Sequence, residues 1–93
     1  MRKNIVFLDR STFPSNILFP KLDFSHEWKN HDFTKVKEVK KRIEKAHIIV
    51  TNKIELNRKN LSGAKNLELI AIIQSKKIFY YKHLSNSLFC IFY

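Results

Sequence analysis

Apolar residues gather in short runs that are separated by polar and irregular stretches. The runs NIVFL (4–8), HIIVT (47–51) and LELIAII (67–73) have the length and apolar content of buried strands. After the first run, apolar side chains recur at helical spacing and predict a helix over about 35–46, with an apolar face formed by Val36, Val39, Ile43 and Ala46. The pattern therefore predicts strands that alternate with helical segments.

Capping residues indicate where the helices begin. Thr34 is suited to cap the first helix, and residues 10–33 before it are expected to be irregular because prolines interrupt them. Asn57 is expected to cap a short second helix that carries Leu61 inward and ends near Gly63. The resulting order, strand–loop–helix–strand–helix–strand, is typical of an α/β domain with a parallel sheet and right-handed crossovers.

In a parallel sheet of this kind, ligands bind beyond the carboxyl ends of the strands. Those ends are Asp9–Arg10, Thr51–Asn52–Lys53 and the residues after Ile73. The tail, residues 74–93, differs from the rest because it holds six of the twelve aromatic residues and no Asp or Glu. Its apolar positions follow neither a strand nor a helix period well, so we expect an irregular or loosely helical tail.

Composition narrows the chemistry that the chain can support. The 93 residues allow one small domain, and they include a single glycine, Gly63, and a single cysteine, Cys90. One glycine can form neither the GxGxxG turn that binds dinucleotides nor a phosphate-binding P-loop. One cysteine excludes disulfides within the chain and cysteine-rich zinc sites. We therefore expect no cofactor-binding and no metal-ligating residues in this chain.

The formal net charge of +10 raises nucleic acid or an anionic surface as a partner. Many of the lysines lie in KVKEVKKRIEK (35–45), the polar face of the predicted helix, and no nucleic-acid-binding motif accompanies them. A solvated lysine-rich face is the favoured interpretation, so nucleic acid is the less favoured partner, and a small basic binding protein stays open as the alternative. The chain has no apolar run near the ~18 residues that span a bilayer and no signal-peptide core, so we expect no membrane partner and a cytoplasmic location.

Titratable residues form no recognisable catalytic motif. The histidines have no spacing typical of a metal site and are expected to be ordinary surface or partly buried residues: His26, His31, His47 and His83. Among the carboxylates, Asp9 has a defined position at a strand end. It could serve acid–base chemistry, or it could start the following turn through its side chain. Taken by themselves, these residues indicate part of an α/β sheet without catalytic residues.

Several stretches of the chain resemble a known family. They are, in order, IVFLDR (5–10), FSHEW (24–28), AHIIVTNKIEL (46–56) and NLELIAI (66–72). They resemble the start of a D-isomer-specific 2-hydroxyacid dehydrogenase, in particular the glycerate dehydrogenase (hydroxypyruvate reductase) branch. TNK directly after an apolar strand, with HEW upstream, is the most specific part of this resemblance.

The resemblance has implications for fold and activity. It implies that residues 1–73 are part of the substrate (catalytic) domain, an incomplete flavodoxin-like (Rossmann-like) three-layer domain with about three parallel strands and crossover helices. Family members are usually homodimers that catalyse NAD- or NADP-dependent oxidoreduction of a 2-hydroxy or 2-oxo acid such as glycerate or hydroxypyruvate. The implied substrate loop consists of Thr51, Asn52, Lys53 and Ile54.

The chain also lacks parts of the family pattern. The family's catalytic Arg, Glu and His and its NAD-binding turn have no counterpart here, so we expect no catalytic residue, no bound cofactor and no activity from this chain unless a separately encoded remainder joins it. Where the family has a glycine-containing substrate loop, this chain has QSKK (74–77). We expect residues 74–93 to be a divergent tail produced by a frameshift or truncation, with a docking or membrane-surface peptide as the alternative. An open sheet edge would follow, which predicts a marginal, aggregation-prone domain.

Overall fold

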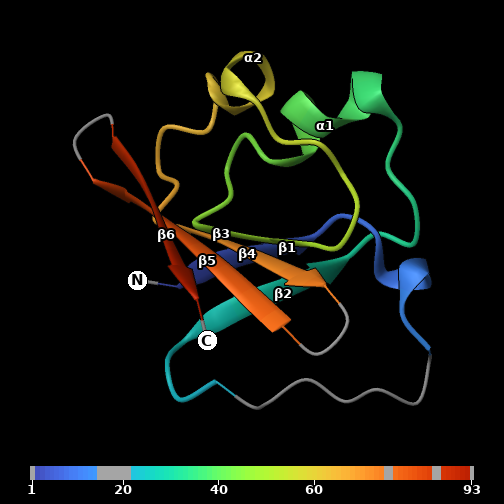
Figure 1. Cartoon of the computed structure of the whole chain (residues 1–93), viewed down its shortest axis with the longest axis horizontal. Coiled ribbons are helices and arrows are strands. Elements are labelled where there is room, and N and C mark those ends of the chain that lie inside the picture. The colour runs from blue at the N-terminus through green and yellow to red at the C-terminus, as the bar shows by residue number, and fades with distance from the viewer. Residues whose placement is uncertain (1, 15–21, 75–76, 85–86, 93) are drawn as a thin grey trace.

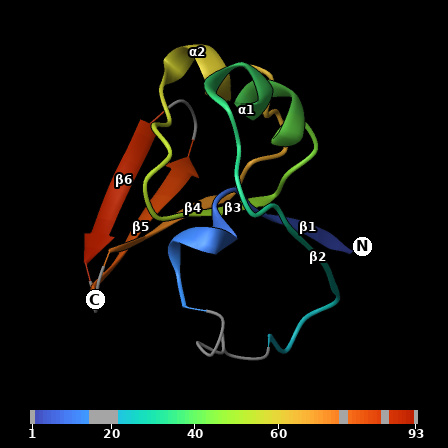
Figure 2. The ribbon, with the colours of Figure 1, turned by 90° about the vertical axis from the view of Figure 1, so that its right-hand side faces the viewer.

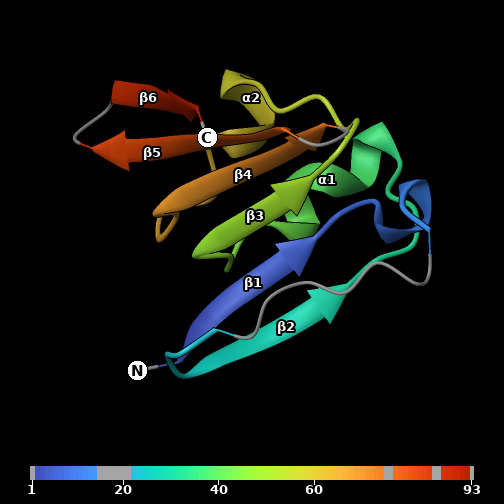
Figure 3. The same ribbon diagram turned by 60° about the horizontal axis from the view of Figure 1, so that its bottom comes forward.

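In the computed structural model, six strands form one sheet in the order β2-β1-β3-β4-β5-β6 (Figures 1 and 3). The structure describes residues 2–14, 22–74, 77–84 and 87–92, with side chains up to residue 72. The strands are β1 (Lys3–Phe7), β2 (His26–Asn30), β3 (Ile48–Thr51), β4 (Leu69–Gln74), β5 (Lys77–Leu84) and β6 (Ser87–Phe92). The described helical segments are η1 (Arg10–Thr12), α1 (Val36–Arg42) and α2 (Arg58–Leu61).

The parallel part of the sheet consists of β2, β1, β3 and β4. Ile5 of β1 lies between Trp28 of β2 and Ile48 of β3, and Val50 of β3 pairs with Ala71 of β4. The apolar runs predicted as strands therefore form β1, β3 and β4, each within one or two residues of the expected bounds. The α/β class and the parallel arrangement are confirmed.

Strand β2 corrects the expectation that residues 10–33 are irregular, and it adds a fourth strand to the parallel part of the sheet. Its sequence, HEWKN, has one large apolar side chain, Trp28, which is half-buried, while Glu27 and Lys29 are exposed. Because β2 is the edge strand of the sheet, its side chains stay partly or fully exposed and need no apolar run. The strand therefore has no hydrophobic pattern strong enough to predict it.

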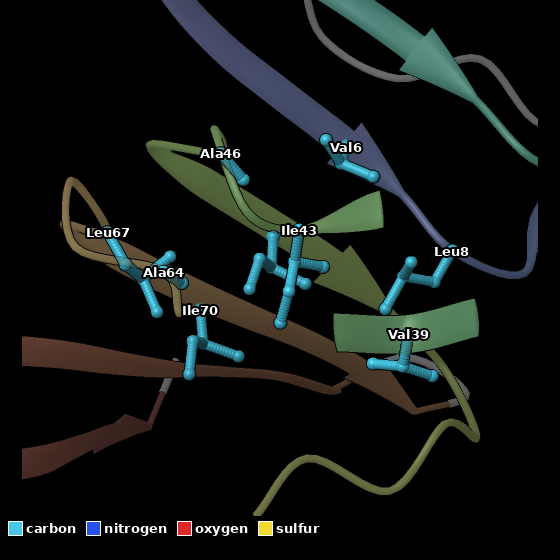
Figure 4. Packing of buried hydrophobic residues seen from close by; sticks show 9 residues of the cluster. Val6, Leu8, Val39, Ile43, Ala46, Ala64, Leu67 and Ile70 are labelled. Atoms are coloured by element: carbon cyan, nitrogen blue, oxygen red, sulfur yellow. The ribbon is translucent and has the colours of Figure 1, made fainter. Parts of the chain in front are cut away.

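Both α-helices cover the same face of the sheet (Figure 2). The core between helices and sheet is formed by Val6, Leu8, Val39, Ile43, Ala46, Ile49, Ala64, Leu67 and Ile70 (Figure 4). Val39 and Ile43 come from α1 and the residue that follows it, and both are almost fully buried, as their spacing predicts. Val36 is 89% exposed, so it does not belong to the apolar face that the same spacing assigned to it.

The first helix begins one residue later than expected. Lys35 is the N-cap, and Glu38, three residues on, accepts a hydrogen bond from the Lys35 backbone N–H at 3.1 Å. Thr34, which the sequence suggests as the cap, instead donates its hydroxyl proton to the carbonyl of Leu8 at 2.6 Å. In α2 the expectation is confirmed, since the Asn57 side chain accepts from the backbone N–H of Asn60 at 2.9 Å.

The opposite face of the sheet is covered by irregular chain rather than by a described helix. Phe13 and Leu22, from the connection between β1 and β2, pack with Trp28 against a second cluster formed by Ile5, Phe7, Val50 and Ala71. The ring of Phe7 meets Phe13 and Trp28 edge-on, with centroids 5.8 and 6.4 Å apart. The third layer expected from the resemblance is therefore a loop in the part of the chain that the structure describes.

The tail corrects the expectation of irregular or helical structure. Strands β5 and β6 form an antiparallel hairpin that extends the sheet beyond β4, with Ala71 opposite Tyr80 and Tyr81 opposite Cys90. The unpaired backbone groups at the edge of β4 favour this outcome, because an added strand satisfies them whatever its side-chain period. Within the described residues, neither α-helix is long and apolar enough to cross a bilayer.

Candidate functional site at the carboxyl end of the sheet

The predicted substrate loop lies at the carboxyl end of β3, next to the carboxyl end of β1. Thr51 is the last residue of β3 and is fully buried, whereas Asn52 and Ile54 are half-buried and Lys53 is exposed. The structure therefore brings these residues to the edge where parallel sheets bind ligands.

A single carboxylate holds this loop. Asp9 is 1% exposed, and its carboxylate accepts hydrogen bonds from the Thr51 hydroxyl at 3.0 Å and from the backbone N–H of Lys53 at 2.7 Å. The backbone N–H of Asn52 donates to both carboxylate oxygens, at 3.0 and 3.2 Å. The hydroxyl oxygen of Thr51 in turn accepts from the backbone N–H of Ile54 at 3.2 Å. The loop is thus shaped by an acceptor-only group that satisfies successive backbone donors.

The sequence left two roles open for Asp9, and the geometry shows a third. Its carboxylate is buried and accepts hydrogen bonds from the loop, so it has a structural role. The following turn does begin at Asp9, but through the backbone: its carbonyl accepts from the N–H of Thr12 at 3.0 Å and from the Thr12 hydroxyl at 2.7 Å, with no cap bond from its side chain.

A second loop, residues 31–34, joins the same edge. The backbone N–H of His31 donates to the carbonyl of Phe7 at 2.8 Å, and the N–H of Arg10 donates to the carbonyl of His31 at 2.9 Å. The guanidinium of Arg42 donates to the Thr34 hydroxyl and to the carbonyl of Phe33, both at 2.8 Å. The sequence did not identify Thr34 and Arg42 as residues that hold this edge together. The pattern that could have indicated them is a polar residue before a helix combined with a basic residue in the last turn of that helix.

The third strand end lies at the limit of the described residues. Gln74 ends β4 and pairs with Lys77, the first residue of β5. The expectation that QSKK replaces a glycine-containing substrate loop falls on residues 75–76 and on side chains outside the described part of the chain. Lys53 and the residues near it are therefore the described portion of the candidate site.

The histidines with described side chains do not converge. No group of three or more metal-ligating side chains occurs among the described residues. His47 is buried at the start of β3, where its Nδ1 accepts from the backbone N–H of Asn4 at 2.9 Å. His26 lies in β2, with Nδ1 2.8 Å from the carbonyl of Phe24. His83 lies in β5, outside the part of the chain whose side chains the structure describes.

Two titratable groups near the second loop have shifted pKa values. Partial burial lowers the pKa of His31, and the positive charges of Arg42 and Lys29 lower it further, against an opposing effect of Glu38. The backbone hydrogen bond from Lys35 lowers the pKa of Glu38, and the charges of Arg42, Lys35 and Lys37 act in the same direction. Nearby positive charge therefore contributes to the lowered pKa of both groups, after burial at His31 and the backbone hydrogen bond at Glu38.

The chain has one glycine, and its place in the fold can be compared with a dinucleotide-binding turn. Its one glycine, Gly63, follows α2, and a Cβ placed there would meet only the Lys40 side chain at the ordinary contact distance of 3.6 Å. No close approach to a ligand backbone requires a glycine at this position. The sequence therefore lacks the glycine-rich turn of the dinucleotide-binding motif.

Comparison with known proteins gives partial matches. No family profile matches the chain, and no solved structure shows significant similarity to it. A Haemophilus influenzae protein whose name places it among the 2-hydroxyacid dehydrogenases is 35% identical over 68 residues, which cover 73% of this chain and 22% of that protein. The glycerate dehydrogenase of Methylorubrum extorquens is 32% identical over 73 residues, which cover 77% of this chain and 23% of that protein.

These matches agree with the family that the resemblance indicates. The chain spans less than a quarter of the length of either relative, at 22% and 23%. Over most of its own length, the chain is a fragment of the 2-hydroxyacid dehydrogenase family.

Proposed function

We propose that residues 1–73 are the substrate-domain segment of a 2-hydroxyacid dehydrogenase and that this chain is inactive by itself. The parent activity is NAD- or NADP-dependent interconversion of a 2-hydroxy acid and a 2-oxo acid in the cytoplasm, with glycerate and hydroxypyruvate as the preferred pair. The match to glycerate dehydrogenase supports this pair.

The observation that carries the proposal is the loop 51–54 held by Asp9 at the carboxyl end of the sheet. In this position the loop would face a small acid bound outside the strand ends. The chain's part in the reaction is therefore to shape one wall of the substrate site. The remainder of the enzyme, encoded together with the chain or separately, would supply the catalytic residues, the cofactor and the dimer contacts.

The tail belongs to the same proposal. Residues 74–93 would be sequence read out of frame after the last shared strand, which happens to pair with β4 as a hairpin. The test is the DNA that follows the codon for Ile73, translated in the other two frames. A glycine-containing segment of the GTDNVD type followed by a GxGxxG turn supports a broken dehydrogenase gene, whereas their absence from both frames contradicts it.

The proposed inactivity has its own measurement. The purified chain is mixed with hydroxypyruvate and NADH or NADPH, and the absorbance of the reduced cofactor is followed. We expect no turnover above that of buffer. Turnover that is lost when the chain is removed would show that the chain carries catalytic residues of its own, and the proposed division of labour would be wrong.

A further inference from the structure

An open groove lies between β2 and α1, away from the loop 51–54. Its volume is about 950 Å³, and its floor includes Asn4, Val6 and Ala46. Alternate side chains of β2 and of the residue that follows it form one wall, and α1 and the turn after it form the other: Glu27, Lys29 and His31 face Lys37, Lys41 and Lys45. Val6 and Ala46 are already buried, and most of the other side chains that line the groove are charged.

Charge in the groove is divided along its length. At the amino end of the strands, Glu27 is the register partner of Asn4, whose side chain donates to the carbonyl of Lys45 at 3.1 Å. At the carboxyl end, Lys29 is the register partner of Val6, and His31 follows β2 near the start of α1. The amino half of the groove thus contains Glu27, Glu44 and Lys45, and the carboxyl half contains Lys29, His31, Lys37, Lys41 and the Arg42–Glu38 pair.

The cations of the carboxyl half are poorly neutralised. Glu38 is committed to Arg42, with an Nη2–Oε2 distance of 3.2 Å, and to the backbone N–H of Lys35. In the part of the chain that the structure describes, the ion pairs are this one and Lys3–Glu68, so Lys29, Lys37 and Lys41 have no carboxylate within ion-pair distance. Partial burial lowers the pKa of His31, and the nearby charges of Arg42 and Lys29 lower it further, against Glu38. An oxyanion placed here would reduce the repulsion among these charges.

We propose that the carboxyl half of this groove binds the phosphate group of a small phosphorylated ligand, with Lys29, Lys37 and Lys41 supplying positive charge and His31 taking up a proton as the ligand binds. A phosphate offers about two negative charges and several acceptor oxygens, which suits a set of point-charge donors. A long polyanion such as nucleic acid fits less well, because the two carboxylates of the amino half, Glu27 and Glu44, outnumber its one lysine, Lys45, and would repel the rest of the polyanion. The proposal does not depend on the dehydrogenase function.

Calorimetric titration with inorganic pyrophosphate at low ionic strength tests the site. We expect the double variant Lys29→Gln/Lys41→Gln to bind pyrophosphate roughly tenfold more weakly than the unmodified chain. The matched control is Lys59→Gln/Lys65→Gln, which removes the same net charge from exposed lysines outside the groove and should change the affinity by less than about twofold. Equal weakening in both double variants, or no binding of pyrophosphate to the unmodified chain, overturns the proposal.

Proton uptake provides a second readout. The groups facing His31 are Lys29 from β2 and Arg42 and Glu38 from α1, and a bound phosphate adds negative charge to this set. We expect pyrophosphate to raise the pKa of His31, measured from the imidazole proton shift in NMR spectra, and His31→Asn to abolish the proton uptake seen by calorimetry in buffers of different ionisation enthalpy. An unchanged His31 titration contradicts the proposal. Tighter binding of a single-stranded oligonucleotide than of pyrophosphate would also overturn it in favour of a nucleic-acid surface.

Discussion

Asp9 connects the ends of two strands that are adjacent in the sheet but about 40 residues apart in the sequence, as the separation of 42 between Asp9 and Thr51 shows. Its position after an apolar run marked it as a residue at the ligand-binding edge. Its partners could not be inferred from the sequence, because they are mainly backbone N–H groups, which every residue except proline carries. The carboxylate explains why the residues after β3 keep a defined loop.

Replacing Asp9 with Asn tests this role. The amide has one acceptor oxygen in place of two and no charge, so at least one N–H of Asn52 or Lys53 would lose its acceptor. We expect the free energy of unfolding to fall by about 2–3 kcal/mol, measured by urea denaturation. Asp23→Asn, at an exposed position, is the matched control and should change it by less than about 0.5 kcal/mol. Equal effects of the two substitutions would show that Asp9 does not hold the loop.

The lowered pKa of His31 makes a prediction about pH. The unfolded chain binds a proton near the ordinary pKa of 6.5, whereas the folded chain resists protonation. The stability that His31 contributes is therefore fully present above about pH 6.5 and is lost as the pH falls through the folded-state pKa. We expect His31→Asn to lose less stability than the unmodified chain between about pH 8 and about pH 5, measured by thermal unfolding. A pH dependence that His31→Asn leaves unchanged would contradict the assignment.

At the scale of elements, Thr34 connects β1 to α1. Its hydroxyl donates to the carbonyl of Leu8, and its oxygen accepts from the Arg42 guanidinium. The same residue type is a good N-cap, which is why the sequence suggested that role. Thr34 bonds to Leu8 instead of capping the helix. The helix can begin at Lys35, whose N–H donates to Glu38, whereas no other described side chain bonds to the Leu8 carbonyl.

Two substitutions at Thr34 separate the contribution of its side-chain shape to stability from the contribution of its hydroxyl. Thr34→Val keeps the branched side chain but leaves the Leu8 carbonyl without its donor, and we expect a loss of about 1–3 kcal/mol in the free energy of unfolding. Thr34→Ser keeps the hydroxyl and should lose less than half as much. Chemical denaturation of both variants provides the comparison. If Ser is as destabilising as Val, the hydrogen bond is not the source of the stability.

Elements with a strong local signal could be predicted, and those stabilised by their neighbours could not. The apolar runs of β1, β3 and β4 and the Asn57 cap each have a local cause, burial on both faces or a side-chain acceptor at a helix start. Strand β2 has a single large apolar residue, Trp28, and forms because β1 offers a free edge. For the same reason the tail forms a hairpin although its side chains have no clear period. The loop 51–54 was located by resemblance, and its shape came from Asp9.

At the scale of the whole molecule, the sheet has a parallel half and an antiparallel end. Strands β2, β1, β3 and β4 form the parallel half, and β5 and β6 extend the sheet beyond the edge of β4. A chain cut after β4 would expose the backbone groups of Leu69–Gln74 as a template for another chain. The expectation of a marginal, aggregation-prone domain stays a prediction. The hairpin makes it more specific, because aggregation should increase when β5 no longer pairs with the edge of β4.

Deletion of residues 75–93 is the corresponding test. We expect the shortened chain to aggregate at a lower concentration than the full chain, as measured by light scattering, because the edge of β4 is then open. Tyr80→Pro in the full chain should act in the same direction, since β5 is paired on both sides and proline removes one backbone donor from it. If both variants remain as soluble as the full chain, the hairpin does not protect this edge.

The central claim is that residues 1–73 form a substrate-domain segment of a 2-hydroxyacid dehydrogenase. A chimera tests it most directly: in the glycerate dehydrogenase of Methylorubrum extorquens, the segment that matches this chain is replaced by residues 1–73. We expect the purified chimera to oxidise NADH with hydroxypyruvate as substrate, with a higher KM than the parent enzyme, because the loop 51–54 meets a site completed by foreign residues. A chimera that folds and binds NADH but reduces neither hydroxypyruvate nor another 2-oxo acid would contradict the claim.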